Sequence, residues 1–277
     1  MLQYTMPLQF VISLAKLPHN VLEFKMQLNY KQTGQGPVVV IMHGLFGSLE
    51  NLNIIAKALS ESFTVINVDL RNHGSSFHDV EMSYPAMAND VLSLLSDLNI
   101  EKAHIIGHSM GGKVAMQLAM LNNNIVDKLV VLDIAPVDYH SRHDKIIQAL
   151  QTVDNASVKS RTEADIMMKN YIEEIGVRQF LLKSLTKVEN DYQWKFNLNK
   201  IVSNYSKIIS NINKTHSCSC ATLFIKGNDS DYILAEHREA IVSLFPNSKA
   251  KVIHGAGHWL HAEKPAAVNR SIIDFLQ

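Results

Sequence analysis

The chain has 277 residues, of which 47% are apolar, and its 26 basic side chains balance 26 acidic ones. A chain of this length can bury a large core without help from disulfides or metals. The balanced charge gives no electrostatic signature of a nucleic-acid partner or an anionic membrane surface, and no apolar run reaches the roughly 20 residues that a membrane-spanning helix needs.

Residues 1–25 are expected to form an N-terminal extension ahead of the folded core. They include an apolar stretch, Leu8–Ala15, but no basic residue precedes it and Lys16 follows it at once. A secretory signal peptide has a basic segment before its apolar one, so this stretch fits one poorly. We therefore expect a cytoplasmic location, and the small number of cysteines fits a reducing compartment.

Short apolar strands then alternate with helical stretches. The uninterrupted apolar run Val38–Met42 is typical of a strand covered on both faces. Further strands are predicted at Phe63–Val68, His104–Ile106 and Lys128–Ile134, and helices at Glu50–Ser60, Pro85–Leu98 and Lys113–Leu121. This alternation predicts a parallel sheet with right-handed crossovers.

The alternation stops between about Val137 and His216, where the sequence is helical and amphipathic and lacks runs typical of a sheet core. It resumes with strands at Ala221–Ile225 and Lys251–Ile253 and helices at Leu234–Leu244 and Pro265–Leu276. The predicted organisation is a sheet domain, residues 26–136 and 217–277, with a helical cap, residues 137–216, inserted after one strand. An insertion of about 80 residues favours a functional lid over a passive loop.

The strongest motif is Gly107–Gly112, with the sequence GHSMGG, between a predicted strand and a predicted helix. With this composition a Gly-x-Ser-x-Gly pattern arises by chance only about 0.04 times per chain. It is typical of a nucleophile elbow, a turn so tight that side chains at Gly107 and Gly111 would clash. Such a turn raises the Ser109 hydroxyl above the sheet edge at a helix N-terminus, where negative charge is stabilised. Ser109 is therefore the expected nucleophile.

A histidine follows the last predicted strand on a loop of small residues, Gly255–Trp259. His258 in this loop can reach over the sheet toward Ser109, and it follows the serine in the chain as the base does in this kind of site. We expect His258 to be the general base. His261 is its serious rival because it lies just beyond the loop, whereas the ring of His108 cannot easily turn back onto Ser109.

The first buried strand is followed by the loop His43–Gly47, with the sequence HGLFG. A backbone N–H from this loop, with that of Met110, can form an oxyanion hole. Leu45 is the expected donor, and Phe46 is the second choice. A further loop, Asp69–Gly74, is expected to brace the strand ends without a chemical role.

Six segments carry a resemblance to a known family. Four of them resemble the α/β-hydrolase superfamily: His43–Leu52, Asp69–Ser76, Gly107–Gly112 and Gly257–Trp259. Two more are similar to the bacterial YbfF-type esterases and their eukaryotic ABHD11-like relatives: Val131–Pro136 and Trp194–Leu198. The resemblance covers nearly the whole chain from about Met26, and it implies an α/β-hydrolase fold: a mostly parallel central sheet flanked by helices, with an inserted helical cap.

The acid member of the triad has two sets of candidates. In much of the superfamily it lies three residues after the glycine that ends the strand before the histidine. Here Ser230 occupies that position after Gly227, and Asp229 and Asp231 flank it. In the resembling esterases the acid is the aspartate in the Asp133 position, and the serine in the Ser230 position joins it to the histidine as a fourth member. A hydroxyl can accept and donate hydrogen bonds, so we favour Asp133 and keep Asp229 and Asp231 as alternatives.

These residues predict a serine carboxylesterase or acyl thioesterase that works by Ser-His-Asp acyl transfer. Its expected partner is a small acyl ester or an acyl-CoA, and we expect a monomer or a homodimer. Other chemistries of the same fold, namely carbon–carbon bond hydrolysis, lyase and haloperoxidase reactions, are the alternative. A binding module would be expected to lack a nucleophile or a base, and this chain has both Ser109 and His258.

The cap is expected to select the substrate. Its apolar side chains either pack the cap or line an acyl tunnel; they are Ile146, Ile147, Leu150, Met167, Met168, Phe180, Leu181, Leu182, Trp194 and Phe196. Lys183, Lys187 and Lys195 either meet a phosphate of acyl-CoA or are ordinary surface charges.

No cofactor and no metal are expected. His216 lies close in sequence to Cys218 and Cys220, but no second pair of ligands follows at zinc spacing. The two cysteines are separated by one residue, and we expect their side chains to diverge rather than to form a disulfide.

Overall fold

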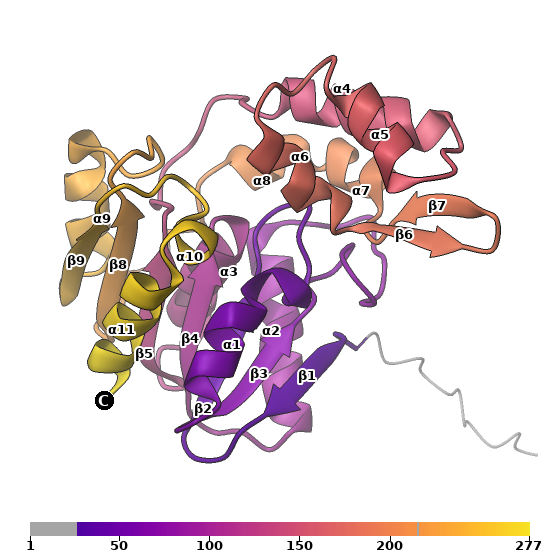
Figure 1. The fold of residues 1–277 in the computed structure, drawn as a ribbon. Coiled ribbons are helices and arrows are strands. Elements are labelled where there is room, and N and C mark those ends of the chain that lie inside the picture. The colour runs from indigo at the N-terminus through magenta and orange to yellow at the C-terminus, as the bar shows by residue number, and fades with distance from the viewer. Residues whose placement is uncertain (1–26, 215) are drawn as a thin grey trace, which may run out of the picture.

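The computed structural model describes residues 27–214 and 216–277, so the extension predicted for residues 1–25 lies outside the described residues. Seven strands form one sheet in the order β1-β3-β2-β4-β5-β8-β9 (Figure 1). They are β1 (Tyr30–Thr33), β2 (Val38–Met42), β3 (Thr64–Val68), β4 (Ala103–His108), β5 (Val126–Leu132), β8 (Ala221–Gly227) and β9 (Ser248–Ile253). β1 runs antiparallel to β3, and the other neighbours are parallel. The predicted mostly parallel sheet is confirmed.

Helices cover both faces of this sheet (Figure 1). One face packs against α1 (Asn53–Leu59), α10 (Leu260–Glu263) and α11 (Pro265–Leu276). The other packs against α2 (Tyr84–Asp97), α3 (Met110–Leu121) and α9 (Arg238–Leu244). Short 3₁₀ turns, η1 (Leu49–Leu52) and η2 (Ala235–His237), precede α1 and α9.

The central strand β2 shows why the sheet is buried on both sides. Val39 and Ile41 point into the core beneath α1 and α11, whereas Val40 and Met42 point into the core beneath α2 and α3. All four are fully buried. Side chains alternate across a strand, so a continuous apolar run supplies both faces at once, and each buried aliphatic side chain contributes roughly 1.5–3 kcal/mol.

The segment between β5 and β8 lies over the C-terminal ends of the parallel strands (Figure 1). We call the described part of residues 137–216 the cap. It contains α4 (Asp144–Asn155), α5 (Arg161–Met168), α6 (Ile175–Leu182), α7 (Leu198–Ser203) and α8 (Tyr205–Ile209). It also contains an antiparallel hairpin that the sequence pattern did not indicate, β6 (Leu185–Val188) with β7 (Asp191–Trp194). The edge strand β1 and the one-turn helix α10 were likewise missed, because each is only four residues long.

Lys113, one turn beyond Ser109 in α3, fastens the cap to the core. Its side chain is buried, and its Nζ donates to the carbonyl of Val137 (2.8 Å), where the cap begins, and to that of Ser210, near its end. The Tyr139 ring lies 4.7 Å from the same nitrogen, a distance at which a ring face attracts a cation. Burial lowers the pKa of Lys113 to about 7. Both crossings between core and cap are therefore tied to the helix that follows Ser109.

The two cysteines correct one expectation. Cys218 and Cys220 precede β8 in irregular backbone, and their Sγ atoms lie 3.0 Å apart as free thiols. Their side chains converge because residues two positions apart share a side of an extended chain.

Among the helices of residues 27–214 and 216–277, none is long and apolar enough to cross a membrane.

Two glycines permit the turn between β4 and α3. A Cβ atom at Gly107 would lie 2.1 Å from the backbone oxygen of Gly111, and one at Gly111 would lie 2.4 Å from that of Met42 in β2. The predicted clash is therefore confirmed, and it involves the neighbouring strand as well as the turn itself. α3 begins at Met110, immediately after Ser109, three residues earlier than expected.

Gly107→Ala is expected to lower the free energy of unfolding by about 3 kcal/mol or more, because rigid backbone must move to admit the methyl group. Gly176→Ala is the matched control, since no described atom lies within 4 Å of a Cβ added at that position in α6. The control should change stability by no more than about 1 kcal/mol, in the stabilising direction. Urea unfolding of both variants measures the difference, and equal effects would contradict the steric account.

Candidate active site

Ser109 lies between β4 and α3 in a strained backbone conformation, with φ 53° and ψ −119°. A non-glycine residue with positive φ costs on the order of 1–3 kcal/mol and must be held by its surroundings. The Ser109 N–H donates to the carbonyl of Leu132 in β5 (3.0 Å), and its own carbonyl accepts from the N–H groups of Gly112 and Lys113. The turn thus fixes the hydroxyl at the N-terminus of α3, over the sheet edge.

His258 lies on the loop between β9 and α10 and reaches Ser109 as predicted. Its Nε2 is 2.9 Å from the Ser109 hydroxyl, and its Nδ1 is 2.7 Å from Oδ2 of Asp133. The His258 side chain is 14% exposed and that of Asp133 is 0% exposed, so the carboxylate end of this line is sealed and the serine end is open. His108 stabilises the loop that carries His258, because its Nε2 donates to the His258 carbonyl (2.8 Å).

Asp133 follows β5 and is the carboxylate that the structure brings to the histidine. Its Oδ1 accepts from the backbone N–H of Gly227 (2.9 Å), and its Oδ2 accepts from the Ser230 hydroxyl as well as from His258. Each oxygen of this fully buried group therefore has a donor, which a buried carboxylate requires. Its φ of 52° is a second left-handed backbone position in the site.

Ser230 does not lie between the histidine and the aspartate, as the expected bridging role required. His258 touches Asp133 directly, and Ser230 donates to the same carboxylate oxygen from the side. The alternative acids lie elsewhere: Asp229 is exposed, and Asp231 is paired with Arg142 at 2.9 Å. The strand order explains this result, because β5 and β8 are neighbours and their ends place Asp133 beside Ser230.

His261, the rival base, is buried on α10, and its ring centroid lies 4.5 Å from that of His108. Its Nδ1 has no hydrogen-bond partner among the described residues. Burial, together with the nearby charges of His258 and Lys183, lowers the pKa of His261 to about 3. His261 is therefore a neutral part of the core, while His258 contacts the serine.

Leu45 and Met110 line a pocket together with Ser109, and their backbone N–H groups have no backbone acceptor among the described residues. The second-choice donor, Phe46, is already engaged, because its N–H donates to Nε2 of His73 (3.2 Å). His73 can accept this bond since its Nδ1 donates to the Arg71 carbonyl (2.9 Å). Burial lowers the pKa of His73 to about 3 and keeps the ring neutral. Of the two loop amides, that of Phe46 is therefore occupied by a histidine from another loop, whereas Leu45 remains the expected oxyanion donor.

The loop Asp69–Gly74 braces the site as expected. The Asp69 carboxylate accepts from the N–H of Leu49 (2.7 Å) and from that of Ser75 (2.9 Å). Arg71 forms a fork of two hydrogen bonds with Asp90 in α2. These bonds fix the loops at the ends of β2 and β3.

A pocket of 230 Å³ opens from Ser109 beneath the cap. Most of its wall is apolar, and its larger side chains are Phe46, Ile146, Val177, Phe180, Leu181 and Trp259. Its polar side is formed by Arg142, His143 and Tyr232 beside His258. Ile146, Phe180 and Leu181 were among the predicted cap candidates, and the other seven do not line the pocket.

Sequence reasoning missed the polar wall of the pocket. Tyr232 lies two residues beyond Ser230, and Arg142 and His143 lie in the first loop of the cap. None of the three belongs to a motif with a known spacing, so only their proximity to Ser230 and to the start of the cap could have pointed to them.

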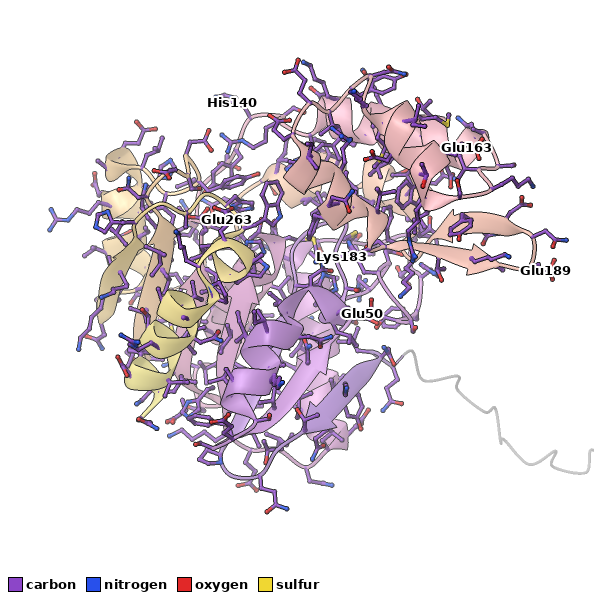
Figure 2. All side chains as sticks on the ribbon, viewed as in Figure 1. Glu50, His140, Glu163, Lys183, Glu189 and Glu263 are labelled. Carbon is purple, nitrogen blue, oxygen red and sulfur yellow. The ribbon has the colours of Figure 1, made fainter. Side chains whose placement is uncertain are left out.

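The three cap lysines lie outside this pocket. Lys195 pairs with Glu50 at 3.3 Å, across the junction of cap and core. Lys183 and Lys187 are exposed, and Figure 2 shows Lys183 and Glu50 at that junction. Within the part of the chain that the structure describes, no three His, Cys, Asp or Glu side chains are grouped to hold a metal ion.

Because His261 is neutral in the fold, the free energy of unfolding should depend on pH in the acid range. In the unfolded chain this group gains a proton near pH 6.5, whereas in the fold its pKa is about 3. Between these values the unfolded state binds more protons, so stability falls as the pH falls. Relative to His261→Phe, the wild type should lose about 2 kcal/mol of unfolding free energy between pH 7 and pH 4.5. Denaturant unfolding at both values measures this, and a constant difference would contradict a neutral His261.

Comparisons with known proteins identify the family of this chain. A model of the family described as the alpha/beta hydrolase fold matches residues 37–265. The esterase YbfF of Escherichia coli is 43% identical over 256 residues, covering 92% of this chain and 98% of that protein. The sn-1-specific diacylglycerol lipase ABHD11 of Mus musculus is 37% identical, covering 87% of this chain and 81% of that protein.

A solved structure described as a marine microorganism esterase superposes with a TM-score of 0.88 at 39% identity, covering 90% of this chain and 99% of that one. The resemblance that the sequence motifs indicated is therefore confirmed. Ser109 in its tight turn and His258 after Gly257 both lie at the C-terminal ends of strands in a mostly parallel sheet. This chain belongs to the α/β-hydrolase family.

Proposed function

We propose that the chain is a serine carboxylesterase that hydrolyses acyl esters by two-step acyl transfer. One observation carries this proposal: the Ser109 hydroxyl, the His258 imidazole and the Asp133 carboxylate form an unbroken line of hydrogen bonds of 2.9 and 2.7 Å at the floor of a mostly apolar pocket. A serine is a weak nucleophile until an adjacent base removes its proton, and the base needs a third group to orient it.

In the first step His258 takes the proton from Ser109, whose oxygen attacks the ester carbonyl. The backbone N–H groups of Leu45 and Met110 receive the resulting oxyanion, and the N-terminus of α3 adds its partial positive charge. His258 then donates its proton to the leaving alcohol. Asp133, held by Ser230 and Gly227, fixes the imidazole and stabilises its charged form.

In the second step water attacks the acyl-enzyme with His258 again as base, and the carboxylic acid leaves. Every group in this sequence comes from one chain, so a monomer and a homodimer would both be active. Its two cysteines are free thiols, and we propose the cytoplasm, a reducing compartment, as its location.

The pocket favours an acyl chain of short or medium length as the group held beneath the cap. Each methylene buried on its apolar wall contributes about 0.8 kcal/mol to binding. For an acyl-CoA thioester, Lys183 and Lys187 are the exposed cations at the cap that could meet a phosphate, whereas Lys195 is already paired with Glu50. Comparing p-nitrophenyl esters with acyl-CoA substrates of the same chain length separates the two substrate classes.

Ser109→Ala is expected to lower the turnover of p-nitrophenyl acyl esters by on the order of 10⁵-fold or more, because no other group can form the acyl-enzyme. The variant should remain folded, which circular dichroism and thermal unfolding check. A fluorophosphonate probe should label the wild type and not the variant. Labelling without ester turnover would indicate a different chemistry of the same fold, such as carbon–carbon bond hydrolysis, lyase or haloperoxidase activity.

Asp133→Asn and Asp231→Asn distinguish the candidate acids. Loss of the Asp133 charge should lower kcat by on the order of 10³-fold or more, because the imidazole loses the group that orients it and stabilises its charge. Asp231 is 70% exposed, and its ion pair within the described residues is with Arg142, so its variant should keep kcat within about threefold of wild type. Near-normal activity of Asp133→Asn with loss in Asp231→Asn would overturn this assignment.

A further inference from the structure

Tyr232 makes a contact with the proposed base that the acyl-transfer mechanism does not use. Its ring lies parallel to the imidazole of His258, with the two centroids 3.7 Å apart and an angle of 14° between the planes. Of the ring pairs in the described part of the chain, this one has the shortest centroid distance. The imidazole therefore has a flat aromatic surface against one of its faces.

The hydrogen bonds of His258 do not fix the tilt of its ring. The N–H bond and the lone pair of an imidazole lie in the plane of the ring, so the hydrogen bonds from Nδ1 to Asp133 and from Nε2 to Ser109 act in that plane. They restrain movement within that plane, but the ring can still tilt about the line that joins the two partners. A second ring stacked on its face opposes this tilt both before and after the proton moves.

Tyr232 is itself held from several sides. Its backbone N–H donates to the Ser230 hydroxyl (3.2 Å), and its carbonyl accepts from the hydroxyl of Tyr139 (2.6 Å). Its own hydroxyl lies 3.3 Å from Nε2 of His143. The guanidinium of Arg142 lies 4.5 Å from the ring centroid, and because the imidazole occupies one face, the guanidinium takes the other. Three of these four contacts come from the first residues of the cap.

The charge balance of this stack favours the reaction. When His258 takes the serine proton, it becomes a cation against an electron-rich ring face, which attracts it. Arg142 on the opposite face would oppose this effect, but its side chain is 30% exposed and its guanidinium lies 2.9 Å from Asp231, so both water and the carboxylate screen its charge. The stack therefore stabilises the imidazolium more than the neutral ring.

We propose that Tyr232 is a positioning residue for the proposed esterase reaction: its ring clamps the plane of His258, and the start of the cap holds that ring in place. This inference rests on the proposed function, because it assigns Tyr232 a role through His258. The cap then takes part in the chemistry as well as covering the pocket.

The test compares Tyr232→Leu, which removes the ring, with Tyr232→Phe, which keeps the ring and removes only the hydroxyl. Tyr192→Leu is the matched control, since it removes a tyrosine ring from the cap hairpin strand β7. Two experiments are done on each variant. The first measures kcat and KM on a p-nitrophenyl ester, and the second measures the second-order rate constant of inactivation by a fluorophosphonate. Titration with the same fluorophosphonate counts folded sites, so that partial unfolding does not enter the rates.

For Tyr232→Leu we expect kcat and the inactivation rate to fall about tenfold, with KM within about twofold, as the loss of one stacked cation–π contact predicts. Tyr232→Phe should keep both rates within about twofold of wild type, and so should Tyr192→Leu. If Tyr232→Leu yields too few titratable sites, Tyr232→Met tests the same loss of the ring with an unbranched side chain.

Wild-type rates in folded Tyr232→Leu, or an equal loss in Tyr232→Phe, would overturn the clamp. A tenfold rise in KM without a change in kcat would also overturn it, because that result assigns Tyr232 to the pocket wall alone. If the wild type is labelled by the fluorophosphonate but hydrolyses no ester, the esterase proposal fails while the inactivation rates still decide the role of Tyr232. A wild type that is not labelled overturns both.

Discussion

The backbone turn from Gly107 to Gly111 holds Ser109 in a left-handed conformation at φ 53°, and the positions of the other groups follow from it. The turn ends a buried strand and begins a helix within two residues, so the hydroxyl stands above the sheet edge and the Met110 N–H is left without an acceptor. Both consequences need a backbone that packs without a Cβ atom against β2 and against itself. The reactive group and one of its proposed oxyanion donors therefore come from the same steric constraint.

Parallel strand packing provides the partners of that serine. The ends of β4, β5 and β8 lie side by side, and they place Ser109, Asp133 and Ser230 within one hydrogen-bonded group although the last two are 97 positions apart. A buried carboxylate is stable only when donors surround it. Asp133 has them in the Gly227 amide, the Ser230 hydroxyl and the imidazole, so the fold itself stabilises the charge that orients the base.

Neutral histidines form much of the support around this group. His73 accepts from the Phe46 amide, His108 donates to the His258 carbonyl, and His261 fills the core behind them. Burial lowers the pKa of each of these three rings. A neutral imidazole offers one donor and one acceptor, which suits it to join two backbone groups in a dry interior. His258, between the sealed carboxylate and the open serine, is partly exposed, as a group that exchanges protons with a substrate must be.

The sequence alone determined the features that depend on local patterns. Apolar runs identified the buried strand β2 and the buried half of β5, Leu129–Leu132, because a segment covered on both faces is apolar on both. The glycine spacing identified Ser109, and the small-residue loop identified His258, because each constraint acts within a few residues. The four-residue strand β1 and the hairpin β6–β7 escaped because segments so short carry little periodic signal.

The sequence could rank its candidates, and only the tertiary structure shows which of them lie beside the proposed base and nucleophile. Asp133 and Asp231 are both acidic residues near strand ends, and the strand order put one under the imidazole and the other beside Arg142 at the surface. Leu45 and Phe46 are adjacent amides, and a histidine from a distant loop occupied the second. The contact of Tyr232 with His258 was likewise invisible in the sequence. Each choice depends on which groups meet across the fold, and such contacts join residues whose separation along the chain follows no fixed spacing.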